Sequence, residues 1–360
     1  MKLSEINLEE NPFDAITPTP SPNLIWAGMS KLKDQFINIY EQTFESKSRK
    51  VVLNWGKYGS GKTHAAYYFA NNRISDVDDE RMVNLYIRTS KDGSIANTEF
   101  VKNLFDSKGI DYWKESIEEA IEEHGKVELT KIISEKIQSE EFTNAIIRLG
   151  EKQQPKLFLS KYIFGKLDAR EMKKLNITRP LKTDTEYVKF LSGIIVAATS
   201  TSKDKRVFIW IDEFEDVIHY TSKQYTILSQ LIRDLVDTVN QKMVLFINMT
   251  LAETEEETVT LLLGRALWDR INKKISFNQI DKQIAFEYCK DLIQHAQIEK
   301  KDTLEPFSEE TIKLILDTIS QEKMTPRDIN KIFYEMIDFA LDNELDLSKK
   351  ETVKSYLEQL

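Results

Sequence analysis

Short hydrophobic runs, bounded by polar clusters, alternate with helical stretches along the first 280 residues of this chain. The runs are rich in β-branched and aromatic residues, which favours strands. They lie at 51–55, 82–89, 206–211, 242–247 and 274–280. Because strands buried on both faces read as continuous apolar segments, this alternation predicts an α/β fold in which a parallel five-stranded sheet lies between helices.

Apolar residues at helical spacing mark the segments between and after these runs. The pattern predicts a helix over 30–46 and further helices near 222–240 and 253–271. Residues 97–202 are mostly helical by pattern, and they separate two strands by far more than a minimal βαβ connection needs. We expect them to form an inserted helical subdomain or a lid over a bound ligand. From Asp281 onward the pattern is helical only, which predicts a small helical lid domain.

The first 23 residues contain four prolines, Pro12, Pro18, Pro20 and Pro22. Proline at this density blocks helix and favours extended structure, which predicts an arm on the surface. We therefore expect an N-terminal arm over 1–29, a core over 30–280 and a lid over 281–360.

Composition is that of a globular protein, with 41% hydrophobic and 30% charged residues, and no apolar run approaches the ~18 residues of a membrane span. The acidic start, MKLSEINLEENPF, lacks the apolar centre of a secretory signal, so we expect a cytoplasmic protein. The net charge of −9 argues against coating DNA through a global field. Segments 161–182 and 265–274 are locally basic, which leaves a local DNA contact or an ordinary solvated helix face open.

Cysteine and histidine usage argues against a structural metal. The single cysteine, Cys289, excludes an internal disulfide. Four histidines are scattered without ligand spacing: His64, His124, His219 and His295.

A glycine-rich pattern follows the first predicted strand. In residues 51–73, VVLNWGKYGSGKTHAAYYFANNR, the residues Gly56, Gly61, Lys62 and Thr63 spell GxxxxGK[ST]. The glycines let backbone N–H groups turn inward and form an anion-binding nest at the start of the helix from Thr63. The strand before the pattern and the helix after it favour a nucleotide site over a chance match in a turn.

This phosphate loop has predicted roles with ATP and Mg²⁺. Lys62 can reach the β- and γ-phosphates, and the Thr63 hydroxyl can ligate Mg²⁺, which bridges the same two phosphates. The predicted nucleotide-binding residues of the loop are Gly56, Lys57, Tyr58, Gly59, Ser60, Gly61, Lys62, Thr63 and His64.

The strand 206–211 runs into two carboxylates, Asp212 and Glu213. Ligands of open α/β sheets bind at the carboxyl ends of the strands. There Asp212 is placed to hold Mg²⁺ through water, and Glu213 to orient or deprotonate the attacking water. Two acids at a strand end can also be plain surface residues, but their position in a chain with a phosphate loop favours ATP hydrolysis over simple binding.

Two polar residues are candidates for contacts with the γ-phosphate. Asn248 directly follows the strand 242–247, so it should emerge beside Asp212; an amide that caps the next turn is the alternative. Arg327 begins a helical stretch, where its guanidinium could bind phosphate oxygens or simply face solvent.

Two arginines, Arg265 and Arg270, lie just before the last predicted strand. In an oligomer either could enter the neighbouring subunit's nucleotide site as an arginine finger. An arginine on a helix face is the commoner arrangement.

The order of these pieces resembles an AAA+ ATPase of the origin-recognition and clamp-loader side of that superfamily. ENPFDAITPTP…LIWAG looks like the segment that encloses the adenine, with Met29 after Gly28 where the family usually has arginine. DRINKKISF is similar to the arginine-finger segment, which favours Arg270, and MTPRDI looks like the sensor-2 segment, which supports Arg327. The resemblance covers roughly residues 10–340.

Residues 162–213 are similar to the segment before the acidic strand end in ATP-binding proteins of bacteriophage-exclusion (BREX) defence systems. The shared pattern is a glycine turn, a short basic helix, an N-I-x-R-P turn and a long helix. The chain is much shorter than the large members of that group, and we expect no winged-helix DNA-binding domain.

These features predict an AAA+ protein that hydrolyses ATP and acts as an oligomeric motor or switch in a DNA-directed assembly, with anti-phage defence as the expected setting. One alternative is a nucleotide-gated switch that recruits a nuclease or another effector. A second is a transposition or replication loader. The acidic balance favours protein partners and homo-oligomers, with DNA contacted through the assembly and no membrane partner.

Overall fold

A computed structural model describes residues 1–14, 19, 24–45, 50–71, 79–239, 242–251, 256–300 and 303–358. The chain divides into two compact units. One consists of Met1–Ile39, Gly56–Asn72 and Ser276–Leu360, and the other of Tyr40–Trp55 and Arg73–Ile275. The prolines at 18, 20 and 22 lie outside the described residues. The boundaries of the arm, core and lid stay a prediction.

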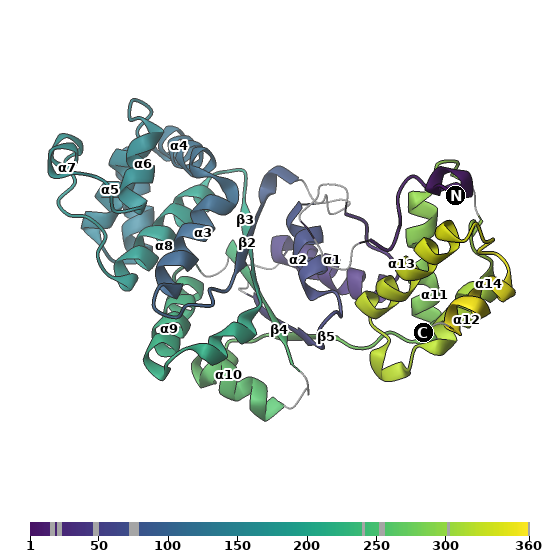
Figure 1. Ribbon diagram of the computed structural model, residues 1–360. Coiled ribbons are helices and arrows are strands. Elements are labelled where there is room, and N and C mark those ends of the chain that lie inside the picture. The colour runs from purple at the N-terminus through teal and green to yellow at the C-terminus, as the bar shows by residue number, and fades with distance from the viewer. Residues whose placement is uncertain are drawn as a thin grey trace. The chain divides into compact units, whose positions relative to one another are not determined.

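Five strands form one parallel sheet flanked by helices (Figure 1). They are β1 (Lys50–Gly56), β2 (Met82–Arg88), β3 (Arg206–Asp212), β4 (Met243–Thr250) and β5 (Lys273–Phe277). Their order in the sheet is β2-β3-β4-β1-β5. The register places Arg88 of β2 opposite Asp212 of β3. The predicted parallel five-stranded sheet is therefore confirmed.

The last strand ends earlier than its apolar pattern suggested. β5 stops at Phe277, three residues short of the predicted end at 280. The reason is the next helix, α11 (Lys282–Ala296), whose N-cap Asp281 accepts a hydrogen bond from the Ile284 N–H. This cap needs a turn before it, so the chain leaves the sheet although Ile280 is buried.

The strand β3 is buried on both faces, and its alternating side chains enter different layers. Ile209 and Ile211 face the core formed with the inserted helices. Phe208 and Trp210 join an aromatic layer with Tyr40 of α1 (Ser30–Glu45) and Phe246 of β4. In this layer the Trp210 indole N–H donates to the Tyr40 hydroxyl, which donates to the Asn84 side chain.

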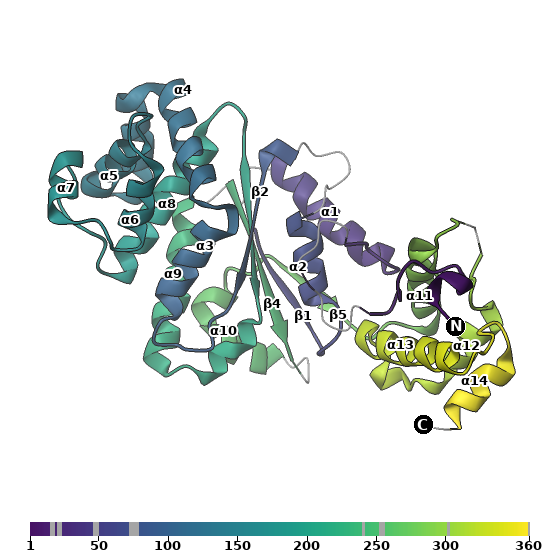
Figure 2. The same cartoon turned by 45° about the horizontal axis from the view of Figure 1, so that its top comes forward.

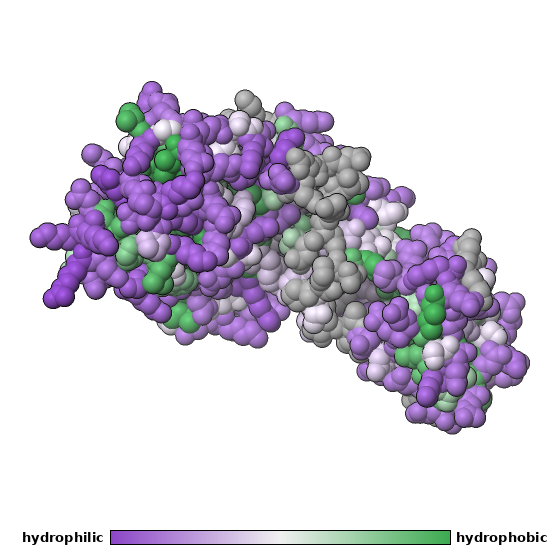
Figure 3. All heavy atoms as spheres, turned by 90° about the horizontal axis from the view of Figure 1, so that it is seen from above, coloured by the Kyte–Doolittle hydropathy of each residue, from purple (hydrophilic) through white to green (hydrophobic). Residues whose placement is uncertain are grey.

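Between β2 and β3, where every residue is described, six helices form the predicted insertion. Figures 1 and 2 show them gathered beside β2 and β3. They are α3 (Ala96–Lys108), α4 (Ile110–Ile137), α5 (Glu140–Gly150), α6 (Lys156–Ile163), α7 (Ala169–Leu175) and α8 (Asp184–Ser200). Their shared core includes Trp113, Ile146 and Phe190, each fully buried. The outer surface of these helices is largely hydrophilic (Figure 3).

Local capping explains where several of these helices begin. The Ser139 side chain accepts from the Phe142 N–H at the start of α5. Thr183 and Glu186 form a reciprocal capping box at the start of α8. After β3 the same unit continues with α9 (Ser222–Val239) and α10 (Glu256–Trp268), which lie within the predicted helical ranges.

The other unit has a separate core built from the two ends of the chain. Among the described residues it contains the first part of α1, up to Ile39, and the whole of α2 (Lys62–Asn71), α11, α12 (Glu309–Thr318), α13 (Pro326–Asp342) and α14 (Lys350–Leu357). Leu8 and Phe13 are fully buried against the C-terminal helices, and the Phe13 ring stacks on Phe333 with centroids 4.8 Å apart. Among the described residues, no helix is both long and apolar enough to cross a bilayer.

The aromatic layer generates a test of the fold. We expect Tyr40→Phe to lower the free energy of unfolding by about 1–3 kcal/mol, because two hydrogen bonds at a buried hydroxyl are lost. Tyr68→Phe is the matched control, since no described residue hydrogen-bonds to the Tyr68 hydroxyl. Urea unfolding measures both changes. Equal stability of Tyr40→Phe and wild type would contradict the role of this hydroxyl.

Candidate functional site

The phosphate loop lies between β1 and α2 and needs glycine for two different reasons. A Cβ at position 56 would lie 2.2 Å from the backbone oxygen of Phe277, so any larger residue would clash. Gly59 has φ +77°, and a Cβ there would lie 2.9 Å from the Cβ of Arg327. Glycine alone fits both the close approach and the left-handed backbone. α2 begins at Lys62, one residue before the predicted start.

The ammonium group of Lys62 is held by the loop itself. Its Nζ donates to the carbonyl oxygens of Gly56 and Lys57, at 2.9 and 2.8 Å, and to the Ser60 hydroxyl at 3.2 Å. Lys62 is buried, with 6% of its surface exposed. These bonds fix a cation inside the loop at the first residue of a helix, where the helix dipole also favours an anion.

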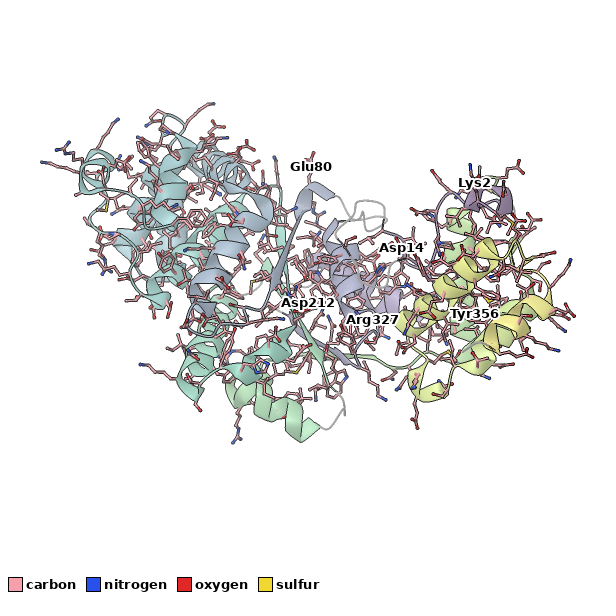
Figure 4. All side chains as sticks on the ribbon, in the orientation of Figure 1. Lys2, Asp14, Glu80, Asp212, Arg327 and Tyr356 are labelled. Carbon is pink, nitrogen blue, oxygen red and sulfur yellow. The ribbon has the colours of Figure 1, made fainter. Side chains whose placement is uncertain are left out.

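Arg327 lies against the phosphate loop within the same unit. Its backbone N–H donates to the Gly59 carbonyl at 3.4 Å, and its guanidinium lies 3.8 Å from the centroid of the Tyr58 ring. Figure 4 shows Arg327 at the start of α13. Thr325 caps that helix, since its hydroxyl oxygen accepts from the Asp328 N–H. The phosphate loop and Arg327, both predicted from the sequence, are thus in contact. The Arg327 guanidinium lies over the exposed Tyr58 ring.

His64, in the first turns of α2, lies in an aromatic cluster. One ring nitrogen lies 2.9 Å from the Ile25 carbonyl, so that nitrogen carries a proton and donates. The rings of Trp26 and Tyr68 pack 6.3 and 6.5 Å from the imidazole, centroid to centroid. The packing removes water from the ring and lowers the pKa of His64, although the Ile25 carbonyl opposes this.

In the other unit, the carboxyl end of β3 carries a buried carboxylate, Asp212, labelled in Figure 4. One oxygen accepts from the Tyr86 hydroxyl at 3.0 Å, and the other accepts from the Asn248 side-chain amide at 2.9 Å. Asn248 in turn accepts from the Asn54 amide at 2.8 Å. Four neighbouring strands therefore contribute side chains to one polar chain, as predicted for Asn248 and Asp212.

Glu213 directly follows Asp212 and has an unusual backbone. Its φ of +53° is left-handed, which costs an L-residue about 1–2 kcal/mol. Its carboxylate is bound by the Arg88 guanidinium at the end of β2. This hydrogen bond raises the pKa of Arg88. The carboxylate of the predicted base is therefore paired with a cation.

The two finger candidates have different surroundings. Arg265 on α10 has a side chain that is 92% exposed and lies 4.0 Å from the Asp269 carboxylate. Arg270 is only 23% exposed and donates to Asp237 at 2.6 and 3.2 Å. Asp237 thus anchors the residue that the resemblance favours, whereas Arg265 reaches freely into solvent.

Sequence reasoning missed three residues of this site. Asn54 interrupts an apolar strand, which was a signal that its side chain has a polar partner. Tyr86 and Arg88 lie on β2, where the register with β3 places them near the strand end. No signal in the sequence gives that register, so these two contacts could be found only from the structure.

The donor set at the end of β3 suits a magnesium ion. Asp212 is 2% exposed, and no lysine or arginine in the described part of the chain pairs with it. A buried carboxylate without a cation is costly, and a divalent cation would offset that cost. Carboxylate oxygens are among the ligands that Mg²⁺ prefers.

Solved structures share the fold of this chain at low sequence identity. The Aeropyrum pernix ORC2 protein matches in its ADP form with TM-score 0.55, over 97% of this chain and 72% of that one. Its ADPNP–ADP complexes match with TM-score 0.57, over 97% and 71%. The A. pernix ORC1 protein in complex with DNA matches with TM-score 0.52, over 98% and 69%. Sequence identity is 10% in each case.

The chain therefore shares the fold of these ORC proteins, a five-stranded parallel sheet between helices with a helical insertion and C-terminal helices, as the resemblance implied. No protein-family model and no curated protein sequence matches it. At this identity the likeness concerns the fold.

The buried imidazole generates a prediction about pH. Because burial lowers the folded-state pKa of His64 below 6.5, the unfolded chain binds the proton more readily. His64 therefore makes its full contribution to the free energy of unfolding above pH 6.5. This contribution is lost as the pH falls through the folded-state pKa. We expect the urea midpoint to drop between pH 7.5 and 5.5 by more in wild type than in His64→Gln, whose amide can still donate. The same drop in both proteins would contradict the assignment.

Proposed function

We propose that this protein binds ATP with Mg²⁺ and hydrolyses it. The observation that carries the proposal is the buried Asp212 carboxylate, oriented by Tyr86 and Asn248 and followed directly by Glu213. Simple nucleotide binding needs only a phosphate loop. An oriented carboxylate for a metal, next to a second carboxylate for water, is what phosphoryl transfer to water requires.

The phosphate loop supplies the binding half of this chemistry. Lys62 already holds its ammonium inside the loop, so it would exchange carbonyl partners for phosphate oxygens, which are stronger acceptors for a cation. The remaining predicted loop residues contribute backbone N–H groups or line the nucleotide. In this proposal Thr63 and Asp212 are the residues that would hold Mg²⁺, and the ion would neutralise charge on the phosphates.

Glu213 is proposed as the residue that orients or deprotonates the attacking water. It must leave Arg88 before its carboxylate can accept a proton, because the guanidinium stabilises the charged form. Asn248, whose side-chain amide donates to Asp212, is proposed to contact the γ-phosphate or its water. Arg327 would exchange the Tyr58 ring for phosphate oxygens, which it can bind through two N–H groups.

The resemblances support a setting in which the ATP is used. Structurally similar proteins have been solved with ADP, with ADPNP and with DNA, which supports a nucleotide-dependent role in a DNA-directed assembly. We propose that the protein acts there as a homo-oligomer with Arg270 as the finger between subunits. The similarity of residues 162–213 to BREX ATP-binding proteins supports anti-phage defence as the pathway.

One observation favours a second candidate function, a nucleotide-gated switch that recruits a nuclease or another effector. Arg88 holds Glu213 in an ion pair, and a base held in this way gives slow hydrolysis and a long-lived ATP state. A switch needs such a state, whereas a motor needs rapid turnover. The rate of Arg88→Ala separates them, because release of Glu213 should accelerate a switch.

Two variants separate binding from turnover. We expect Lys62→Ala to lower ATP affinity at least about 100-fold, since a buried charge-assisted contact is lost. Glu213→Gln should keep wild-type affinity and lose about 100-fold or more in turnover, because an amide cannot take the proton. Calorimetry and phosphate release measure the two effects, with exposed Lys91→Ala as the control. Normal turnover by Glu213→Gln would remove that residue from its role.

Mixing experiments test the finger. Arg270→Ala should lose turnover, and adding Glu213→Gln subunits should restore part of it, because a mixed boundary then combines one intact finger with one intact base. Arg265→Ala serves as the matched comparison. Restoration with Arg265→Ala but not with Arg270→Ala would transfer the role to the exposed arginine, and no loss in either variant would contradict a finger in this segment.

A further inference from the structure

Residues 166–182, here called the basic tip, form a cationic surface of the inserted helices. The segment contains six basic and two acidic residues in a chain whose net charge is −9. It includes the short helix α7, which Figures 1 and 2 place at the outer end of the insertion, and that end is hydrophilic in Figure 3. The proposed ATP binding and hydrolysis do not use this surface.

Hydrogen bonds and buried side chains hold the backbone of the basic tip. Asp168 accepts hydrogen bonds from the Arg170 and Glu171 N–H groups at 2.8 Å each, and the Glu171 carboxylate accepts from the Asp168 N–H at 3.0 Å. Leu167 and Leu175 are buried at either end of α7 and fasten it to the other helices. The tip is therefore a rigid platform for its outward side chains.

Its acidic residues do not neutralise its cations. Asp168 is committed to the helix cap, and Glu171 also binds the Lys161 ammonium. These contacts lower the pKa of Glu171. Arg179 is paired with the neighbouring acids Glu141 and Glu186.

The remaining cations face solvent. Five exposed side chains make no ion pair with any described residue: Lys166, Arg170, Lys173, Lys174 and Lys182. Arg170, Lys173 and Lys174 lie at i, i+3 and i+4 on α7, which places them on one face of the helix.

We propose that the basic tip binds the phosphodiester backbone of a nucleic-acid duplex without reading its sequence. Adjacent cations on one helix face match the closely spaced phosphates of a duplex and release condensed counterions on binding. Contacts of this kind position a protein but do not read bases. The tip would thus allow this acidic protein to bind nucleic acid directly.

The absence of large exposed hydrophobic side chains in 166–182 separates this partner from two others. The four aliphatic residues Leu167, Leu175, Ile177 and Leu181 are all buried, and no exposed large hydrophobic residue lies in this fully described range. Protein interfaces need an apolar centre, and single strands need aromatic rings on which bases stack. The tip offers exposed charge without a large apolar or aromatic group, which suits a duplex.

The test measures binding of a fluorescent mixed-sequence 20-base-pair duplex, as DNA and as RNA, by anisotropy from 25 to 200 mM salt. Lys173→Ala/Lys174→Ala should weaken binding about tenfold at low salt and reduce the slope of log K against log salt by about 1–2, because each lost phosphate contact removes ~0.9. Lys131→Ala/Lys136→Ala, two exposed lysines on α4, is the charge-matched control and should bind as wild type.

Each outcome decides the proposal. Equal loss in the control pair, or no loss in the Lys173→Ala/Lys174→Ala protein, would overturn it. Tighter binding of a single strand or of polyglutamate than of either duplex would also overturn it. DNA and RNA duplexes that bind alike support backbone recognition in general, whereas a preference for one identifies the source. Lys62→Ala should bind duplex normally, so failure of the ATPase proposal leaves this test intact.

Discussion

The buried carboxylate of Asp212 is the constraint on which the rest of the site depends. Placing a charge at the end of a fully buried strand is costly unless hydrogen bonds and a cation compensate it. Tyr86 and Asn248 supply the hydrogen bonds from the strands on either side, and the register of the sheet makes their contacts possible. The strand order β2-β3-β4-β1 then extends the chain of polar contacts to Asn54, two residues before the phosphate loop begins.

The polar chain of side chains and the phosphate loop are joined directly in the sequence. β1 carries Asn54 and runs directly into Gly56, so the strand that closes the polar chain also starts the phosphate loop. Glu213 also joins the fold to the site. Its left-handed backbone turns the chain out of β3, and its carboxylate binds Arg88. A strained residue at such a position is typical of functional sites, where surrounding structure holds it in place.

Much of the fold could be predicted because apolar runs and helical spacing are strong local signals. All five strands, the helical insertion and the C-terminal helices follow from those patterns, and the glycine spacing of the loop predicts the bend that the structure shows. The partners of the predicted residues could not be predicted. Arg88 against Glu213, Tyr58 under Arg327 and Asp237 against Arg270 join residues 33 to 269 positions apart, and only tertiary packing sets such pairs.

The most direct test is the coupling between magnesium and Asp212. Calorimetry would measure the affinity for ATP with Mg²⁺ and with EDTA, in wild type and in Asp212→Asn, which keeps the shape of the side chain and removes its charge. If Asp212 holds the ion, Mg²⁺ should tighten ATP binding to wild type by at least about tenfold more than to the variant, since a coupling of ~1.4 kcal/mol corresponds to that factor. An equal effect of Mg²⁺ in both proteins would contradict the account.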